Sequence, residues 1–210
     1  MKLRQLEMTL QQLAGFPKPR PSLEQYQTPS PLAARLLYHA FMKGDIDGKN
    51  ICDLGCGTGI MAIGAALLGA NSVKGVDIDR DAVRMAEENA MLLGTEVEFM
   101  VADILDQALP ARLHPCDTVI MNPPFGAQKA HADRPFIDVA ISIAPITYSI
   151  FNTGSIRFVE AYIRGRADIT ETVGGKFPLR RTFTFHTKDV QEIGVEILRL
   201  MRTDRPDRTA

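Results

Sequence analysis

The sequence has few cysteines and no long apolar run, and each of these absences excludes a class of protein. Its 210 residues include only Cys52, Cys56 and Cys116. An odd number of cysteines does not form a complete disulfide framework, and their spacing matches no common zinc finger. We therefore expect buried, reduced thiols and no metal. No apolar stretch reaches membrane-spanning length and the N-terminus lacks the centre of a signal peptide, so we expect a cytoplasmic protein without a membrane span.

Charges of the two signs nearly balance, but they are unevenly distributed along the chain. The formal net charge is −1. Residues 1–50 carry 7 Lys and Arg against 4 Asp and Glu, residues 51–150 carry 6 against 13, and residues 151–210 carry 11 against 8. An acidic centre between basic ends suits a small cationic ligand in the middle and a polyanion held by the flanks. A chance distribution of charges over solvent-exposed faces, unrelated to any ligand, is an equally good explanation.

The N-terminal region, residues 1–31, reads as a short helix followed by an extended lead-in. Four leucines lie on one face of the expected amphipathic helix: Leu3, Leu6, Leu10 and Leu13. Five prolines within residues 15–31 disfavour regular structure there. The next helix is expected to begin at Ser30 and Pro31 and to end near Gly44.

Beyond this region, short apolar segments alternate with helical periodicity. We predict strands at 49–54, 72–78, 96–103, 116–122 and 146–152. We predict helices at 59–70, 80–94, 136–144 and 155–166. Residues 180–187 and 195–202 alternate without a helix between them, and Asp79 is a candidate helix cap. The pattern predicts an α/β fold, with a mostly parallel seven-stranded sheet, helices on both faces and an antiparallel C-terminal hairpin, in one domain spanning residues 1–210.

A glycine-rich turn, "DLGCGTG" at residues 53–59, joins the first predicted strand to the helix after it. Gly55, Gly57 and Gly59 lack side chains, so the backbone can turn tightly and approach a ligand. The spacing is G-x-G-x-G and differs from the G-x-G-x-x-G of the dinucleotide fingerprint. The turn alone is therefore weak evidence for a nucleotide site.

Acidic residues lie at the ends of three consecutive predicted strands, at the edge where open α/β sheets bind ligands. They are Asp53, Asp77 and Asp103. Each alone is equally a turn former or a helix cap. Together with the glycine turn, and without a nearby phosphate-binding lysine, they indicate a ligand that resembles adenosine and carries positive charge. S-adenosylmethionine meets both conditions.

The fourth predicted strand runs directly into Asn122, Pro123, Pro124 and Phe125. Two prolines cannot continue a central strand because each lacks an N–H group, so the simplest interpretation is a turn. A rigid corner of this kind can also hold a planar amine. Asn122 and Pro123 would accept its two hydrogens, which frees the nitrogen lone pair for attack, and Phe125 would stack on a base.

With these motifs, the sequence resembles the class I, Rossmann-like S-adenosylmethionine methyltransferases, whose motifs occur in order within residues 49–126. The N-terminal region, "VIMNPPFG" and "FHTKDVQEIGVEILRL" further resemble the methyltransferase-like family that makes N6-methyladenosine in small-subunit ribosomal RNA. This similarity covers nearly the whole chain and is weakest over residues 127–180. It implies methyl transfer from S-adenosylmethionine to the N6 amine of an adenosine in structured RNA.

By matching positions, the resemblance assigns cofactor contacts to Gln25, Thr28, Gly55, Thr58, Ile60, Asp77, Asp103 and Ile104. The lead-in would close over the methionine end of the cofactor. Asp77 would hold the ribose, and Asp103 with the backbone of Ile104 would bind the adenine. Eukaryotic members have a second cysteine where this chain has Thr58, which should not harm a site made from backbone groups.

The same resemblance suggests where RNA and a partner protein bind. Basic candidates for the RNA backbone are Lys176, Arg180, Arg181, His186 and Lys188. Tyr26, Lys129 and His131 are further candidates, although each of these residues is also an ordinary surface group. Eukaryotic relatives work with a small zinc-binding activator protein that covers an exposed sheet edge, so such a protein is a candidate partner.

Two other functions stay open from the sequence. The same corner serves methylation of other planar amines: adenine N6 in DNA, guanine N2 in ribosomal RNA, or the side-chain amide of a protein glutamine. Glutamine-specific enzymes more often have Tyr at the position of Phe125. A non-catalytic RNA-binding assembly factor with the same fold is the second alternative, and the presence of every expected site residue argues against it.

Overall fold

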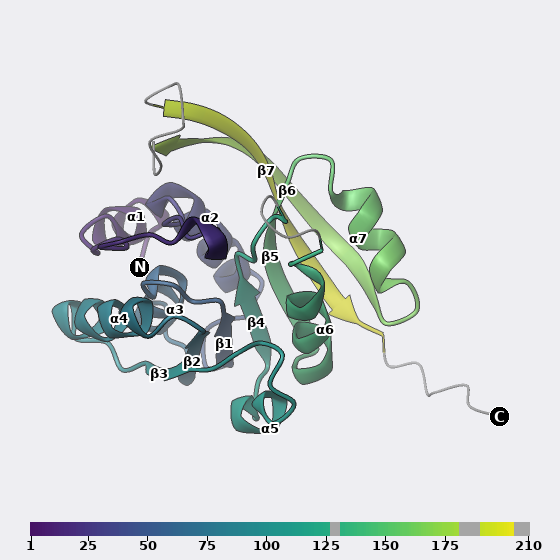
Figure 1. The fold of residues 1–210 in the computed structure, drawn as a ribbon, viewed down its shortest axis with the longest axis horizontal. Helices are drawn as coiled ribbons and strands as arrows, with labels where there is room; N and C mark the ends of the chain where they lie inside the picture. Colours follow the sequence, from purple (N-terminus) through teal and green to yellow (C-terminus); the bar gives the residue numbers. More distant parts are fainter. Residues whose placement is uncertain (127–130, 181–189, 204–210) are drawn as a thin grey trace.

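A computed structural model shows a seven-stranded sheet with helices on both faces (Figure 1). It describes residues 1–126, 131–180 and 190–203. In chain order, the strands are β1 (Asn50–Leu54), β2 (Ser72–Asp77), β3 (Glu98–Val101), β4 (Thr118–Met121), β5 (Ile146–Asn152), β6 (Ala167–Arg180) and β7 (Val190–Arg202). In the sheet they lie in the order β3-β2-β1-β4-β5-β7-β6.

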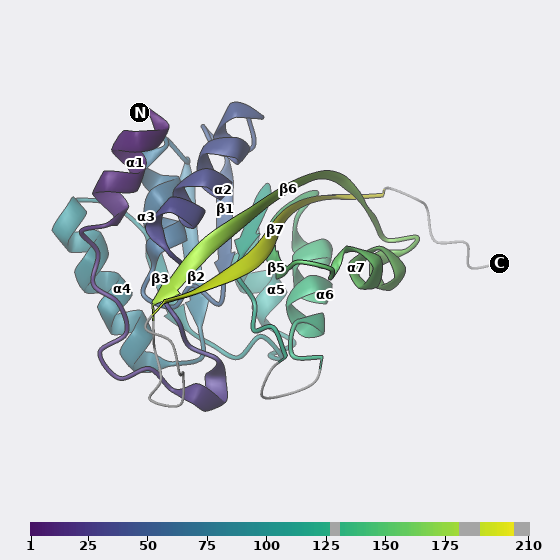
Figure 2. The same ribbon diagram turned by 90° about the horizontal axis from the view of Figure 1, so that it is seen from above.

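Parallel pairing joins β3, β2, β1, β4 and β5. The last two strands are antiparallel, because β7 pairs in the opposite direction with both β5 and β6. The hairpin of β6 and β7 extends beyond the ends of the other strands (Figures 1 and 2). The predicted fold class, including the C-terminal hairpin, is therefore confirmed.

The first strand of this hairpin begins earlier than the sequence predicted. We expected a strand at 180–187, but β6 already extends from Ala167 to Arg180, and residues 181–189 lie outside the described part of the chain. Gly174, Gly175 and Pro178 interrupt the apolar alternation in this stretch. Pro178 is tolerated because β6 is the last strand of the sheet, where its missing N–H group breaks no ladder on the outer side.

The helices are α1 (Leu3–Leu10), α2 (Ser30–Met42), α3 (Ile60–Leu67), α4 (Arg80–Leu93), α5 (Leu109–Leu113), α6 (Arg134–Ile143) and α7 (Ile156–Ile163). Helices α1 to α4 contribute to the apolar core on one face of the sheet, and α5 to α7 to the core on the other. Successive residues of a strand supply opposite faces: Ile51 belongs to the first core, and Cys52 to the second. Helix α5 has only five residues and was not predicted.

Local signals explain why α4 forms where it does. The side chain of Asp79 accepts a 3.1 Å hydrogen bond from the backbone of Asp81, which confirms the predicted cap. Gly94 ends the helix with a φ of +61°, a left-handed conformation that glycine adopts without strain. Buried residues recur at helical spacing along its inner face: Ala82, Val83, Ala86 and Ala90.

The N-terminal helix packs as its leucines predict. Leu6, Leu10 and Leu13 are buried in the core with α2 and α3, whereas Leu3 remains 38% exposed. The three cysteines are free and, as predicted, buried. Among the described residues, no group of three His, Cys, Asp or Glu side chains could hold a metal ion. Within the same ranges, every helix is too short or too polar to cross a membrane.

Candidate active site

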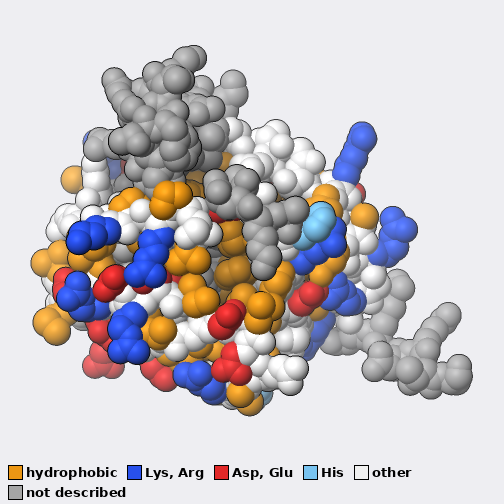
Figure 3. Space-filling view, in the orientation of Figure 1, with side chains coloured by type: hydrophobic (Ala, Val, Ile, Leu, Met, Phe, Trp, Pro, Cys, Tyr) orange, Lys and Arg blue, Asp and Glu red, His pale blue; other side chains and the backbone are white. Residues whose placement is uncertain are grey.

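A cavity of about 340 Å³ lies at the carboxyl ends of β1 to β4. Figure 3 shows hydrophobic side chains gathered around a hollow on this face of the molecule. Eleven of the twelve residues predicted as catalytic or cofactor-binding line it: Gln25, Thr28, Gly55, Thr58, Ile60, Asp77, Asp103, Ile104, Asn122, Pro123 and Pro124. The twelfth, Phe125, is half-buried beside the cavity wall and packs against the core formed with α1 to α3.

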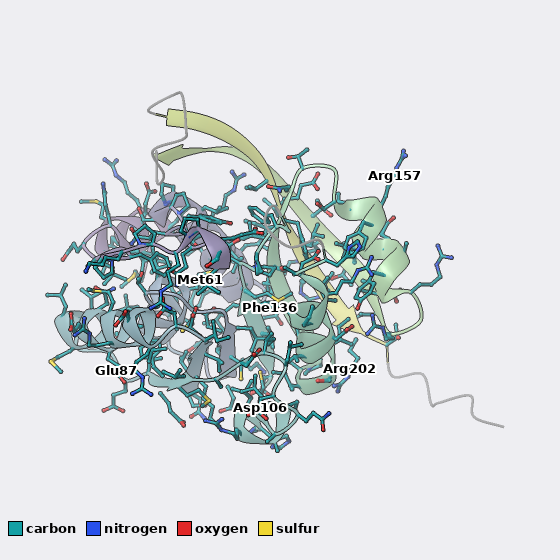
Figure 4. The ribbon with its side chains drawn as sticks, in the orientation of Figure 1. Met61, Glu87, Asp106, Phe136, Arg157 and Arg202 are labelled. Atoms are coloured by element: carbon teal, nitrogen blue, oxygen red, sulfur yellow. The ribbon has the colours of Figure 1, made fainter. Side chains whose placement is uncertain are left out.

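Apolar side chains from both faces of the sheet complete the wall. Met61 of α3 and Phe136 of α6 are labelled in Figure 4, and both line the cavity, as does Phe16 of the lead-in. The sequence did not single out these residues. Their periodicity marks them only as apolar positions of a helix or loop, and the packing of distant elements decides that they face a ligand site.

The glycine turn has the tight backbone that its sequence predicts. Gly55, Gly57 and Gly59 have φ angles of +72°, +54° and +86°, in the region that residues with side chains avoid. A Cβ atom on Gly57 would lie 2.8 Å from Cζ of Phe16, and one on Gly55 would lie 3.0 Å from Cε1 of Phe136. The turn is therefore enclosed by aromatic rings and leaves no room for side chains at these positions.

Asp77 and Asp103 both lie at the cavity, but in different environments. The Asp77 carboxylate accepts hydrogen bonds from the backbone of Gly57 at 2.8 Å and of Asp79 at 2.9 Å. Burial raises the pKa of Asp77 above its ordinary value, and these two hydrogen bonds oppose the shift. Asp103 is exposed and accepts from the backbone of Leu105 at 2.9 Å. Asp77 thus braces the glycine turn, whereas Asp103 stands at the rim.

Asp53, at the start of the glycine turn, is fully buried. Its Oδ2 atom accepts a 2.9 Å hydrogen bond from the backbone of Ala62, whereas no donor among the described residues reaches Oδ1. Burial raises the pKa of Asp53 to about 8, which the hydrogen bond from Ala62 opposes and the nearby Asp77 reinforces. Asp53 does not line the cavity, so its unpaired oxygen is a place for the proton that the raised pKa favours and has no shown contact with a ligand.

The proline-rich lead-in is fixed against the cavity by buried side chains. The Gln25 amide donates to Asp79 at 2.7 Å, and its oxygen accepts from the backbone of Arg20 at 2.8 Å. Earlier in the chain, Ala14 is bonded to Asn89 of α4. The Asn89 side chain accepts from the backbone N–H of Ala14 at 2.9 Å and donates to its carbonyl at 3.0 Å. These contacts hold the lead-in as an ordered wall, and the sequence did not reveal the role of Asn89.

Asn122 directly follows β4, and the lead-in holds both ends of its carboxamide. Tyr26 donates a 3.0 Å hydrogen bond from Oη to Oδ1 of Asn122, and Nδ2 of Asn122 donates to Oγ1 of Thr28 at 2.9 Å. The ring of Tyr26 lies 5.8 Å from that of Phe125, centroid to centroid. Thr28, which was predicted to meet the cofactor, thus contacts the predicted catalytic asparagine, and Pro123 beside it is buried.

Most of the predicted RNA contacts cannot be placed from the described residues. Lys176 and Arg180 belong to β6, but their side chains are outside the described part. The same holds for the whole of Lys129, Arg181, His186 and Lys188. His131 lines the cavity with a φ of +66°, and Tyr26 contacts Asn122 rather than the open surface.

A glycine turn, acidic strand ends and an Asn-Pro-Pro corner around one cavity define a class of enzyme. Residues 31–161 match the family model described as Methyltransferase small domain, so the chain belongs to this family and is a methyltransferase. It is 34% identical to the rRNA N(6)-adenosine-methyltransferase METTL5 of Danio rerio, over 97% of this chain and 100% of the relative. An uncharacterized protein of Methanocaldococcus jannaschii is 40% identical over 95% of this chain and 94% of its own length.

A solved structure shows the same architecture. The crystal structure of a protein from Pyrococcus horikoshii superposes with a TM-score of 0.88 and 36% identity, covering 97% of this chain and 98% of the other. Because the match extends over both chains almost completely, it includes the N-terminal region and the C-terminal hairpin as well as the central sheet.

Proposed function

We propose that this chain transfers a methyl group from S-adenosylmethionine to the N6 amine of an adenosine in small-subunit ribosomal RNA. The proposal depends above all on one observation: the corner at Asn122 and Pro123 lines the same cavity as the glycine turn and the acidic strand ends. The name of the METTL5 relative, an rRNA N(6)-adenosine-methyltransferase, supports the choice of substrate.

The residues around the cavity suit S-adenosylmethionine. A carboxylate offers about four acceptor positions, and those of Asp77 that the backbone of Gly57 and Asp79 does not use remain for ribose hydroxyls. Asp53 is fully buried and does not line the cavity, so its carboxyl would act on the positive charge of the cofactor only electrostatically. Asp103 and the backbone of Ile104 would hold the adenine at the end of β3. When bound, the cofactor supplies a methyl group activated by the adjoining sulfonium.

The lead-in would form the cover of the methionine end. Gln25 is buried and bonded at both ends of its amide, so it fixes the backbone of this segment at the cavity. Thr28 is also buried and lines the same wall. Residues 1–31 would thus belong to one catalytic unit with the rest of the chain, residues 32–210.

At the corner, Asn122 and Pro123 would activate the amine. The N6 nitrogen of adenine is a poor nucleophile because its lone pair is delocalised into the ring. The Oδ1 atom of Asn122 and the carbonyl of Pro123 would accept its two hydrogens and draw the nitrogen toward tetrahedral geometry. The fixed φ of Pro123 and Pro124 holds these acceptors in place before the reaction. Stacking on Phe125 would contribute about 1–3 kcal/mol to base binding.

The target base has to leave any helix to reach this corner, so the substrate is an unstacked adenosine in structured RNA. A small zinc-binding activator protein is part of the same proposal. The edge strand β3 offers it a surface, where Val101 is 41% exposed. With ribosomal RNA as substrate, we propose a cytoplasmic location.

A transfer assay with labelled cofactor on separated RNA, DNA and protein tests the reaction. We expect label in RNA, at adenosine N6, and mapping of ribosomal RNA from cells with and without the protein identifies the nucleotide. Asn122→Ala should reduce transfer about a hundred- to a thousandfold with cofactor affinity within about threefold. The exposed Asn152 at the end of β5 provides the control, Asn152→Ala, which should remain active. Full activity of Asn122→Ala contradicts the proposal.

A further inference from the structure

Both polar ends of the Asn122 carboxamide are bonded to the lead-in. Tyr26 reaches Oδ1 across 96 positions of sequence, and Thr28 reaches Nδ2 across 94. Tyr26 and Thr28 are two residues apart, so one short stretch of chain contacts the oxygen and the nitrogen of the same side chain. Gln25, one position earlier, is fixed to Asp79 beside the end of β2. The stretch is therefore anchored independently of Asn122.

The Tyr26 hydroxyl is a donor under all ordinary conditions. Burial raises the pKa of Tyr26 above its usual value, although the hydrogen bond with Asn122 opposes this shift. The hydroxyl consequently stays protonated and donates to Oδ1. An amide oxygen has two lone pairs, so this bond leaves one of them for a second donor.

An asparagine side chain has a broad, roughly two-fold χ2 preference, so a free carboxamide exchanges the places of its oxygen and its NH2 group. The exchanged form would present a donor to an amine that is itself a donor. Only the orientation with Oδ1 toward the substrate can accept an N–H hydrogen. Contacts that favour this orientation therefore determine the fraction of molecules in which Asn122 can accept a hydrogen bond from the substrate amine.

We propose that Tyr26, together with Thr28, is a positioning residue that fixes the carboxamide of Asn122 with one oxygen lone pair available to the substrate amine. The inference rests on the proposed function, because it requires Asn122 to be the acceptor. Tyr26 donates a hydrogen bond to the oxygen of the carboxamide, and Thr28 accepts one from its nitrogen. In an exchanged carboxamide, the NH2 group would face the Tyr26 hydroxyl and the oxygen would face the Thr28 hydroxyl. Restoring both bonds would then require the two hydroxyls to exchange their donor and acceptor roles.

Three substitutions test this without disturbing the core. Tyr26→Phe keeps the ring that packs near Phe125 and removes only the hydroxyl. Thr28→Val keeps the shape of the side chain and removes the acceptor, whereas Thr28→Ser retains it. Tyr26→Phe and Thr28→Val each remove one hydrogen bond to Asn122 and should each lower kcat about tenfold. The double variant Tyr26→Phe/Thr28→Val should lose about fiftyfold or more, and Thr28→Ser should stay within about threefold of the parent enzyme.

The control is Tyr38→Phe, because Tyr38 of α2 is also half-buried and packs beside an aromatic ring, that of Phe41 at 6.1 Å. This variant should leave kcat unchanged. The KM and Kd for S-adenosylmethionine should stay within about twofold in Tyr26→Phe and Tyr38→Phe, since a positioning role affects the reacting orientation rather than cofactor binding. A general structural defect would change the affinity along with kcat.

Nuclear magnetic resonance of the Asn122 side chain gives a readout independent of activity. In the parent protein its two amide protons should be distinct and slow to exchange with water. In Tyr26→Phe/Thr28→Val they should exchange faster and lose their separate environments, and in Tyr38→Phe they should not change. A loss of kcat with unchanged Asn122 resonances overturns the positioning role.

The outcomes also separate this inference from the proposed function. If Asn122→Ala is inactive while Tyr26→Phe and Thr28→Val keep full kcat, the positioning role is wrong and the proposed function stands. If Asn122→Ala itself keeps full activity, the proposed function fails and the positioning inference fails with it.

Discussion

The amide of Gln25 donates a 2.7 Å hydrogen bond to the carboxylate of Asp79, and both side chains are buried. Asp79 also caps α4 and gives its backbone N–H to Asp77. One contact thus joins the proline-rich lead-in to α4 and to the end of β2, where Asp77 lines the cavity. This explains how a segment with little regular structure becomes part of an ordered site.

Replacement of Gln25 by Ala should therefore affect stability and cofactor binding together. The substitution removes the Gln25 amide that donates to the buried Asp79 carboxylate, and the lost hydrogen bond costs about 1–3 kcal/mol. We expect that decrease in the free energy of unfolding, measured with urea, and a severalfold weaker binding of S-adenosylmethionine by calorimetry. Gln12→Ala, at an exposed position of the same region, is the control and should change neither quantity. Equal behaviour of the two variants would show that the contact does not order the lead-in.

The glycine turn allows a prediction that separates backbone strain from lack of space. Gly57→Ala introduces a side chain at a φ of +54°, with Cβ 2.8 Å from Cζ of Phe16. Gly94→Ala has similar strain, at +61°, but nothing lies within 4 Å of its Cβ. Both should lose about 1–2 kcal/mol of stability. Only Gly57→Ala should also lower the affinity for S-adenosylmethionine, by at least about tenfold, because the turn or Phe16 must move. A normal affinity in Gly57→Ala would contradict a cofactor site at this turn.

The buried Asp53 predicts an unusual dependence of stability on pH. Its pKa is raised to about 8 in the folded protein, from an ordinary value of 3.8. Between these values the folded chain holds a proton that the unfolded chain has released, so this group's contribution to stability falls as the pH rises from about 4 to about 8. Asp53→Asn removes this term.

Urea unfolding of the parent and of Asp53→Asn at pH 5 and pH 8 measures the effect. From pH 5 to pH 8, the free energy of unfolding of the parent should fall relative to that of Asp53→Asn by more than about 1 kcal/mol. This amount corresponds to less than one unit of pKa difference. The test uses the protein without cofactor, because a bound positive group would favour the ionised carboxylate. A constant difference between the two proteins would show that Asp53 is ionised throughout this range.

Arg199 of β7 and Asp45, which follows α2, form a largely buried ion pair at 2.9 Å. Arg199 also donates to Tyr148 of β5 at 3.0 Å, so one side chain links the C-terminal hairpin to the neighbouring strand and to the segment after α2. Arg199→Met leaves the Asp45 charge without its partner and should cost about 3–5 kcal/mol. Arg84→Met, which removes an exposed pair with Glu88, should cost less than about 1 kcal/mol in the same urea measurement. Similar losses in the two variants would contradict a structural role for Arg199.

Local sequence was sufficient for much of the central fold. The five parallel strands and the helices α3, α4 and α6 follow from period-two and helical spacing of apolar residues, and from caps such as Asp79 and Gly94. The glycine turn and the acidic strand ends could also be placed, because the carboxyl ends of parallel strands meet at one edge of the sheet. Strand β6 could not be placed correctly, since Gly174 weakens the strand pattern and Pro178 fits a strand of this length mainly at an edge.

By itself, the sequence determined which residues stand at the carboxyl ends of the strands: the Asn-Pro-Pro corner, the glycine turn and the acidic residues. Only the tertiary structure decided how they are held. The contacts of Tyr26 and Thr28 with Asn122, and of Asn89 with the backbone of Ala14, join positions 75 to 96 residues apart. Such contacts leave no periodic trace in the chain, because they depend on how separately formed elements pack, and a hydrogen bond between distant residues requires only suitable groups in the right place.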